Sequence, residues 1–360
     1  MCSRLRRSGV ALVLLVAATA MTGASTDSPP IFGVKYGNQG WDLQSVRALE
    51  SWQGRTHEVL VLFTNWDRRR DVQDNLFDQQ LPAIWKHGSV PLITWEPYTG
   101  DTTPSDIVSR IGSGAYDDYV ADWGRRLREF LAGTDRRLGT DDDRRVYLRL
   151  AHEMNGNWYP WGQRSPERFI AMWKRVRAIF ADLGLGPTHV QWMWCVTNTD
   201  HGPFAAEAYY PGDGFVDWVA VDGYNWGAST RTSKWQTPAE VLGSMVSRVR
   251  AVASTKPLAL AEVASTSLTA NGDDADAKGR WITDLFAWVR NQPVRMVCWY
   301  NVDRDAEFAA FGGVKGDTTL TASGRTLQVY SAYRAAVQGL GPAVSTSERR
   351  LLTDQRFGGQ

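Results

Sequence analysis

The sequence predicts a single (β/α)8 barrel, and three observations support this fold class. Eight short runs of mostly β-branched and aliphatic residues recur along the chain, and segments with helical spacing separate them. Strands that alternate with helices pair in parallel through right-handed crossovers, and eight such units close a barrel. Setting aside 24 N-terminal residues of the 360 leaves 336, a natural size for one such domain.

The eight expected strands follow the chain in order. They cover residues 31–36, 58–63, 90–95, 146–152, 190–195, 218–224, 258–263 and 294–300. An open doubly wound sheet is the structural alternative. It is disfavoured because no strand is followed by the glycine-rich turn G-x-G-x-x-G or by a P-loop.

Helical spacing fills several of the segments between these strands. The expected helices include residues 42–52, 116–130, 166–180, 238–252, 277–289 and 321–337. Pro166 and Pro238 stand at or near the first helical position, where the missing N–H of proline costs nothing. These prolines therefore support the starts of two of the helices.

The residues before and after the predicted barrel lack its alternation of strand and helix patterns. Arg4, Arg6 and Arg7 precede a run of small and aliphatic residues at 10–20, which is typical of a secretory signal peptide over residues 1–24. The run is too short for a stable transmembrane helix, although a retained anchor and a twin-arginine route remain alternatives. Residues 25–30 are expected to be a linker, residues 31–337 the folded domain and residues 338–360 a disordered tail.

The charge composition of the chain argues against a nucleic-acid partner. Basic and acidic residues number 40 and 39, and no basic stripe is interleaved with aromatic residues, so nucleic acid is not expected as a partner. We expect a secreted monomer without stable membrane insertion after signal cleavage. Cys2 leaves with the signal, and Cys195 and Cys298 either form a disulfide or remain two buried thiols.

Alternation along a strand indicates which side chains point into the barrel. On the fourth strand Val146, Leu148 and Leu150 share the face expected to meet the helices, whereas Tyr147, Arg149, Ala151 and Glu153 share the inner face. Asp222 and Tyr224 are expected to point inward from the sixth strand. Alternation does not place Glu262, because it shares a face with Leu258 and Leu260.

In such barrels the reactive side chains lie at the carboxyl ends of the strands. The candidates at these ends are Trp95, Glu96, His152, Glu153, Asp222, Tyr224, Glu262 and Trp299. A zinc site of the H-E-x-x-H type is excluded by spacing, because the residue four positions after His152 is Gly156. No metal or other cofactor is therefore expected.

Paired carboxylates offer a better explanation of these strand ends. Cleavage of a glycosidic bond needs one carboxyl group that protonates the leaving oxygen and a second that attacks or stabilises the anomeric centre. Glu153 and Glu262 fit these roles, and the 17 tryptophans of the chain provide flat rings for stacking on sugars. The structural alternatives are a Glu153 that pairs with Arg149, an Asp222 that only forms buried hydrogen bonds, and aromatic residues that only pack a loop.

The motif around Glu153 resembles that of a known family. His152-Glu153, followed by Asn155-Gly156, Trp158 and Trp161-Gly162, resembles the acid/base motif of glycoside hydrolase family 26. The resemblance extends over about residues 31–337. The family comprises β-mannanases, with β-1,3-1,4-glucanases and β-1,3-xylanases as less common activities, on a TIM barrel.

This resemblance implies a role for each candidate residue. Glu153 becomes the general acid/base and Glu262 the nucleophile, with Tyr224 bonded to the nucleophile and Trp299 as the floor of the adjacent subsite. His152 orients Glu153 or contacts sugar, whereas Trp158 and Trp161 line the leaving-group side. Arg149 and Asp222 are supporting residues, and Glu96 matches the family pattern without an assigned role.

The resemblance also implies a reaction. A secreted endo-acting enzyme would cleave a β-linked polysaccharide, with β-1,4-mannan as the first substrate, through a covalent glycosyl-enzyme. Retention of configuration predicts carboxyl groups about 5–5.5 Å apart. The alternatives are a β-1,3-1,4-glucanase, a β-xylanase and a barrel that binds carbohydrate without cleaving it.

Overall fold

The computed structural model describes residues 29–322, 324–341 and 351–360. The expected signal peptide, and most of the linker that follows it, lie outside this range. In the described part of the chain, no helix combines the length and apolarity that a membrane span requires.

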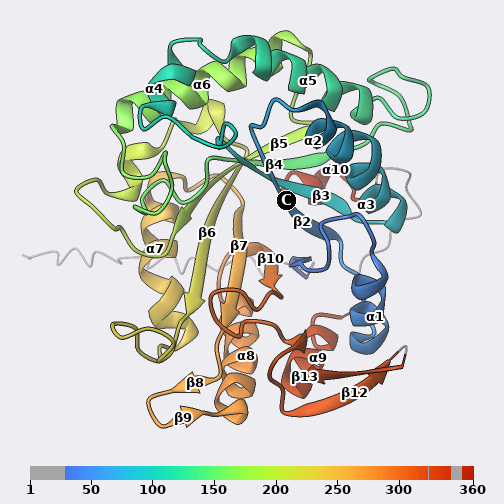
Figure 1. Cartoon of the computed structure of the whole chain (residues 1–360), viewed down its shortest axis with the longest axis vertical. Coiled ribbons are helices and arrows are strands. Elements are labelled where there is room, and N and C mark those ends of the chain that lie inside the picture. The colour runs from blue at the N-terminus through green and yellow to red at the C-terminus, as the bar shows by residue number, and fades with distance from the viewer. Residues whose placement is uncertain (1–28, 323, 342–350) are drawn as a thin grey trace, which may run out of the picture.

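Eight parallel strands close into a barrel, which confirms the predicted (β/α)8 fold (Figure 1). Their order around the barrel is β1-β10-β7-β6-β5-β4-β3-β2. The strands are β1 Ile31–Lys35, β2 Val59–Asn65, β3 Val90–Glu96, β4 Val146–Leu150, β5 Val190–Thr197, β6 Trp218–Asn225, β7 Leu258–Ser265 and β10 Val294–Tyr300. Each coincides with an expected strand to within a few residues.

Helices surround these strands (Figure 1). They are α1 Gln44–Gln53, α2 Arg70–Asp74, the π-helix η1 Asn75–Gln80, α3 Leu81–His87, α4 Ile107–Gly112, α5 Asp117–Leu131, α6 Pro166–Asp182, the 3-10 helices η2 Ala206–Tyr209 and η3 Asp213–Phe215, α7 Pro238–Val252, α8 Ala275–Arg290, α9 Ser331–Gln338 and α10 Asp354–Phe357. Pro238 is the first residue of α7, and Thr237 and Glu240 form a capping box before it. The predicted start of this helix is therefore correct.

Two hydrophobic clusters fill the domain, one between the strands and the helices and one inside the barrel. On β4, Val146, Leu148 and Leu150 belong to the outer cluster and Tyr147 to the inner one. The alternation predicted for this strand is thus confirmed as far as Leu150. Cys195 and Cys298 are both buried and free, so the two cysteines form no disulfide.

The expected helix over residues 321–337 is wrong in its first half. The antiparallel strands β12 Thr318–Ala322 and β13 Arg325–Val329 occupy this region, and β11 Phe311–Gly313 pairs with β13. A smaller hairpin elsewhere joins β8 Leu268–Thr269 to β9 Gly272–Asp273. β-Branched threonines favour strands, and Gly324 turns the chain at a φ of 73°. The helix α9 begins only at Ser331.

The expectation of a disordered tail over residues 338–360 is wrong for the last ten residues. The Phe357 ring packs on Tyr147 at 4.8 Å between centroids, and the Phe357 carbonyl accepts hydrogen bonds from Tyr147 Oη (3.2 Å) and Trp218 Nε1 (3.1 Å). Arg356 donates to Glu58. Because these partners lie at or near the amino ends of strands, the segment 351–360 covers the end of the barrel opposite the carboxyl ends. Leu352 and Phe357 supply the apolar side chains that fix it there, since both belong to the inner cluster.

Candidate active site

A pocket of about 740 Å³ opens at the carboxyl ends of the barrel strands. Five of the predicted site residues line it: Glu96, Glu153, Trp158, Tyr224 and Glu262. They come from β3, from the loop after β4, from β6 and from β7. The pocket therefore joins the two carboxyl groups that lie more than a hundred residues apart in the sequence.

A β-bulge directs Glu262 into this pocket. The pairing of β6 with β7 joins Val221 to Leu260 but Asp222 to Glu262, so β7 contains one extra residue at Ala261. A bulge of this kind turns two successive side chains toward the same face. Ala261 belongs to the inner cluster and Glu262 lines the pocket, whereas Leu260 packs outside.

Glu153 reaches the pocket through a tight turn rather than through strand alternation. β4 ends at Leu150, so the alternation that was expected to place Ala151 and Glu153 on the inner face does not continue to these residues. Ala151 and Glu153 adopt φ angles of 45° and 53°, which are uncommon for residues other than glycine. The Glu153 N–H donates to the Cys195 carbonyl at 2.9 Å and ties the turn to β5.

Arg149 holds the carboxylates at the base of the pocket. Its Nη1 donates to Asp222 Oδ2 at 2.7 Å, and its Nη2 donates to Glu262 Oε1. Thr94 Oγ1 accepts from Nε at 3.0 Å and from Nη2 at 2.7 Å, so the guanidinium is fixed from two sides. The Tyr224 hydroxyl donates to Glu262 Oε2, and both oxygens of Glu262 therefore have a donor.

The environment of Glu153 differs from that of Glu262, because neighbouring negative charges favour its protonated form. Its side chain is buried, and burial together with the negative charges of Asp222 and Glu262 raises its pKa well above the usual range. A hydrogen bond from Trp158 Nε1 to Glu153 Oε2 at 2.8 Å opposes this shift. Glu153 is thus a carboxyl group that retains its proton at a pH where an exposed glutamate would lose it.

His152 is buried next to Tyr159, one of the residues that line the pocket. It is buried, and burial lowers its pKa well below the usual range, so the ring is neutral. Its Nε2 lies 3.1 Å from the Tyr159 hydroxyl. Tyr159 in turn stacks on Trp161 at 4.5 Å between centroids.

Two predicted cleft residues lie elsewhere. Trp161 is fully buried behind Tyr159 and does not line the pocket, although its Nε1 donates to the His152 carbonyl at 2.8 Å. Trp299 is also fully buried, on the outer face of β10 against Trp281 and Tyr333.

The residue that lines the pocket at the end of β10 is Tyr300, not Trp299. Alternation from Met296 and Cys298, which lie in the inner cluster, places Tyr300 on the inner face and Trp299 outside. The sequence signal for this assignment was therefore present. Lys35 at the end of β1 and Tyr159 after β4 also line the pocket and were not among the predicted site residues.

Glu96 lies in the pocket with a perturbed carboxyl group. Burial and the negative charge of Glu262 raise the pKa of Glu96 to about 7. Glu96 and Tyr98 also line a second groove of about 350 Å³, which has Trp41 at its rim. Trp41 is 48% exposed. The main pocket therefore continues into a groove that offers a further aromatic face.

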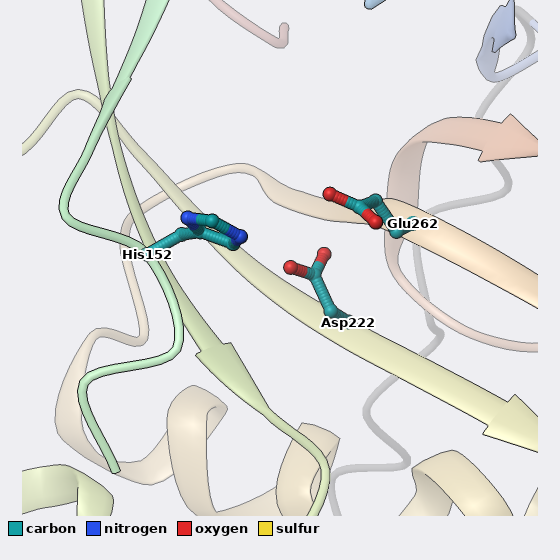
Figure 2. A group of neighbouring side chains, drawn as sticks. All are labelled: His152, Asp222 and Glu262. Carbon is teal, nitrogen blue, oxygen red and sulfur yellow. The ribbon is translucent and has the colours of Figure 1, made fainter. Parts of the chain in front are cut away.

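His152, Asp222 and Glu262 come close enough to suggest a metal site. Their potential ligand atoms lie within 4.8 Å of one another, and Figure 2 shows the three side chains directed toward a shared space. Arg149 already donates to both carboxylates, so a guanidinium supplies the positive charge that a cation would bring. The group is explained by this ionic network, and the expectation of a metal-free site stays a prediction.

Comparison with known proteins gives consistent matches. Residues 15–256 match the model of glycosyl hydrolase family 26. Endoglucanase H of Acetivibrio thermocellus is 26% identical over 274 residues, which are 73% of this chain and 27% of that protein. Mannan endo-1,4-beta-mannosidase of Bacillus subtilis strain 168 is 26% identical over 220 residues, 58% of this chain and 53% of the relative. The chain thus spans about a quarter and about half of the length of these two relatives.

Solved structures share the fold. A GH26 β-mannanase from Bacteroides ovatus superposes with a TM-score of 0.58 at 18% identity, and the match covers 91% of each chain. An endo-β-1,4-mannanase double mutant from Cellulomonas fimi gives 0.56 at 17% identity, over 91% of this chain and 73% of that one. At this identity the likeness concerns the barrel rather than the reaction.

Proposed function

The chain belongs to glycosyl hydrolase family 26, and on that premise we propose that it is a secreted, monomeric, endo-acting glycosidase of a β-linked polysaccharide. We propose Glu153 as the general acid/base and Glu262 as the nucleophile of a double displacement. One observation carries this proposal: a carboxyl group with a raised pKa and a carboxylate held by Arg149 and Tyr224 line the same pocket.

In the first step, Glu153 gives its proton to the glycosidic oxygen while Glu262 attacks the anomeric carbon. The bond to the leaving group breaks, and an ester forms between the sugar and Glu262. The raised pKa of Glu153 supplies the proton near neutral pH. The donors on Glu262 keep the carboxylate in one orientation, so that little reorganisation is needed for attack.

In the second step, Glu153 acts as a base. Esterification removes the negative charge of Glu262, which is one of the causes that raise the Glu153 pKa. The Glu153 carboxylate then accepts a proton from water, the water oxygen attacks the anomeric carbon and the ester breaks. Two inversions give net retention, and the predicted separation of the carboxyl groups remains about 5–5.5 Å.

The surroundings of the pocket support binding of a polymer. Trp158 is 46% exposed and donates to Glu153, so it stands on the leaving-group side with a face available to a sugar. The groove that begins at Glu96 and Tyr98 extends the pocket toward Trp41. Space for sugars beyond the cleaved bond favours endo action.

The backbone sugar has two candidates. β-1,4-Mannan is the first, because mannan endo-1,4-beta-mannosidases are among the relatives and β-mannanases among the similar structures. A β-glucan is the second, because the stretch shared with Endoglucanase H covers 73% of this chain. A barrel that binds carbohydrate without cleavage is disfavoured, because both carboxyl groups are present in the pocket.

An activity screen tests the proposal. The wild type and Glu262→Gln are incubated with galactomannan, barley mixed-linkage glucan and xylan, and new reducing ends are counted. We expect the wild type to cleave one of these polymers and the variant to be inactive. Glu129→Gln, an exposed glutamate on α5, is the matched control and should keep full activity. A wild type that releases no more ends than Glu262→Gln on every polymer contradicts the proposal.

A further inference from the structure

Lys35 is a buried cation in the pocket that the proposed reaction does not use. It is the last residue of β1, is 8% exposed and lines the pocket near Glu262. Among the described residues its ammonium has no hydrogen-bond partner, and Nζ lies 5.5 Å from the centroid of the Phe63 ring. An ammonium carries three N–H donors, and because Lys35 lines the pocket these donors are available to oxygen atoms of a bound ligand.

Negative charge in the pocket offsets the positive charge of Lys35, although no described residue accepts a hydrogen bond from its ammonium. When both carboxylates are ionised, Arg149, Asp222 and Glu262 together carry one negative charge. Burial lowers the pKa of Lys35 to about 8, with Glu262 opposing and Arg304 adding to this shift, so Lys35 is mostly protonated at neutral pH. The positive charge of Lys35 offsets the net charge of this trio. A ligand therefore needs to bring neutral oxygen acceptors, such as hydroxyl groups, rather than a negative charge.

The position of Lys35 identifies the part of the substrate that it faces. β1 is joined to β7, which bears Glu262, through β10 alone, whereas β2 and β3 separate β1 from β4. The leaving-group side is marked by Glu153 and its partner Trp158 after β4. Lys35 thus lies toward the nucleophile, on the side that holds the sugar retained in the covalent intermediate.

We propose that Lys35 is a substrate-binding residue whose ammonium donates hydrogen bonds to hydroxyl oxygens of the sugar on the glycone side of the cleaved bond. This inference rests on the proposed function, because it takes Glu262 as the nucleophile. The assignment makes Lys35 a determinant of which sugar is accepted, since the positions of the hydroxyls differ between backbones.

The test replaces Lys35 by methionine, which keeps the length of the side chain without its donors. We measure kcat/KM on aryl β-mannobioside and aryl β-cellobioside, whose sugar lies only on the glycone side, and on the polymer that the wild type cleaves. We expect a loss of about 10- to 100-fold for Lys35→Met on the aryl glycoside as well as on the polymer. Lys86→Met, an exposed lysine on α3, is the control and should behave as the wild type.

Thermal unfolding separates binding from a role in the fold. Removal of a desolvated cation without hydrogen bonds should leave the melting temperature of Lys35→Met unchanged or raise it. A lowered melting temperature would assign the ammonium to the fold, and an unchanged kcat/KM on the aryl glycoside would mean that it contacts no sugar. Either result overturns the inference while the hydrolase proposal stands.

Binding titration distinguishes this inference from the proposed function. Mannopentaose and cellopentaose are titrated into the wild type and Lys35→Met. A wild type that binds one of them but cleaves nothing contradicts the hydrolase proposal, and weaker binding to Lys35→Met then still supports hydrogen bonds from Lys35 to the sugar. Equal binding to both proteins, or no binding to either, overturns it.

Discussion

Glu153 and Glu262, two of the carboxyl groups that line the pocket, are the same side chain in two different environments. Glu153 stands on a tight turn after β4, buried among negative charges, whereas Glu262 stands on a bulge of β7 with donors on both oxygens. The first arrangement favours a protonated acid and the second an oriented carboxylate. Neighbouring charges and backbone irregularities, not residue type, therefore distinguish the proposed roles of the two glutamates.

The largest expected effect tests this division of roles directly. Glu262→Gln should lose more than 10⁴-fold in kcat on every substrate, because no leaving group replaces a nucleophile. Glu153→Gln should lose about 10²- to 10⁴-fold on polymer. For formation of the glycosyl-enzyme, this loss should shrink on an aryl glycoside whose phenolate leaves without a proton.

The measurement is pre-steady-state release of the phenol, which follows the first step alone. If Glu153→Gln lost as much in this step with the activated leaving group as with polymer, its role as an acid would be refuted. If Glu262→Gln still gave a burst of phenol, its role as the nucleophile would be refuted. Glu129→Gln is again the reference for an exposed glutamate.

A smaller effect should follow from loss of Arg149, which binds Glu262 but not Glu153. Arg149→Met leaves Asp222 and Glu262 buried without their shared guanidinium, which should lower the free energy of unfolding by about 3–5 kcal/mol. Urea unfolding at pH 7 measures this change. Arg125→Met, an exposed arginine on α5, should stay within about 0.5 kcal/mol of the wild type, and a similar value for Arg149→Met would argue against the network.

The smallest expected effect is a shift in the alkaline limb of the pH profile of kcat/KM, which we attribute to Glu153. The proton on Glu153 is required for the first step, so activity falls as pH rises through its raised pKa. The Trp158 N–H lowers that pKa, so Trp158→Phe should raise it and move the alkaline limb of kcat/KM to higher pH. Trp41→Phe, at the rim of the groove, should leave the limb in place. A limb that moves to lower pH in Trp158→Phe would contradict this account of Glu153.

The regular parts of the barrel could be predicted from the sequence. Strands and long helices have periodic patterns, and alternation correctly directed Tyr147 and Arg149 inward and Val146 outward. The same alternation, started from Met296, points to Tyr300 in place of Trp299. That error came from transferring the family's subsite tryptophan to Trp299, not from a missing signal in the strand.

The irregular parts could not be predicted in this way. A bulge such as that at Ala261 is a matter of register between two strands, and neither strand shows it alone. The turn at Glu153 needs positive φ angles at residues that seldom adopt them. Order in residues 351–360 depends on surfaces contributed by distant strands, so local composition gave no sign of it.

The placement of residues 351–360 has a consequence for the stability of the barrel. Arg356 donates to the Pro29 carbonyl just before β1 and to Glu58 just before β2, and the Phe357 carbonyl is held from β4 and β6. Arg356 and Phe357 thus bridge segments that lie far apart in the sequence. We expect a chain that lacks residues 351–360 to leave the inner faces of Tyr147 and Trp218 open to water, which should lower the free energy of unfolding of the barrel.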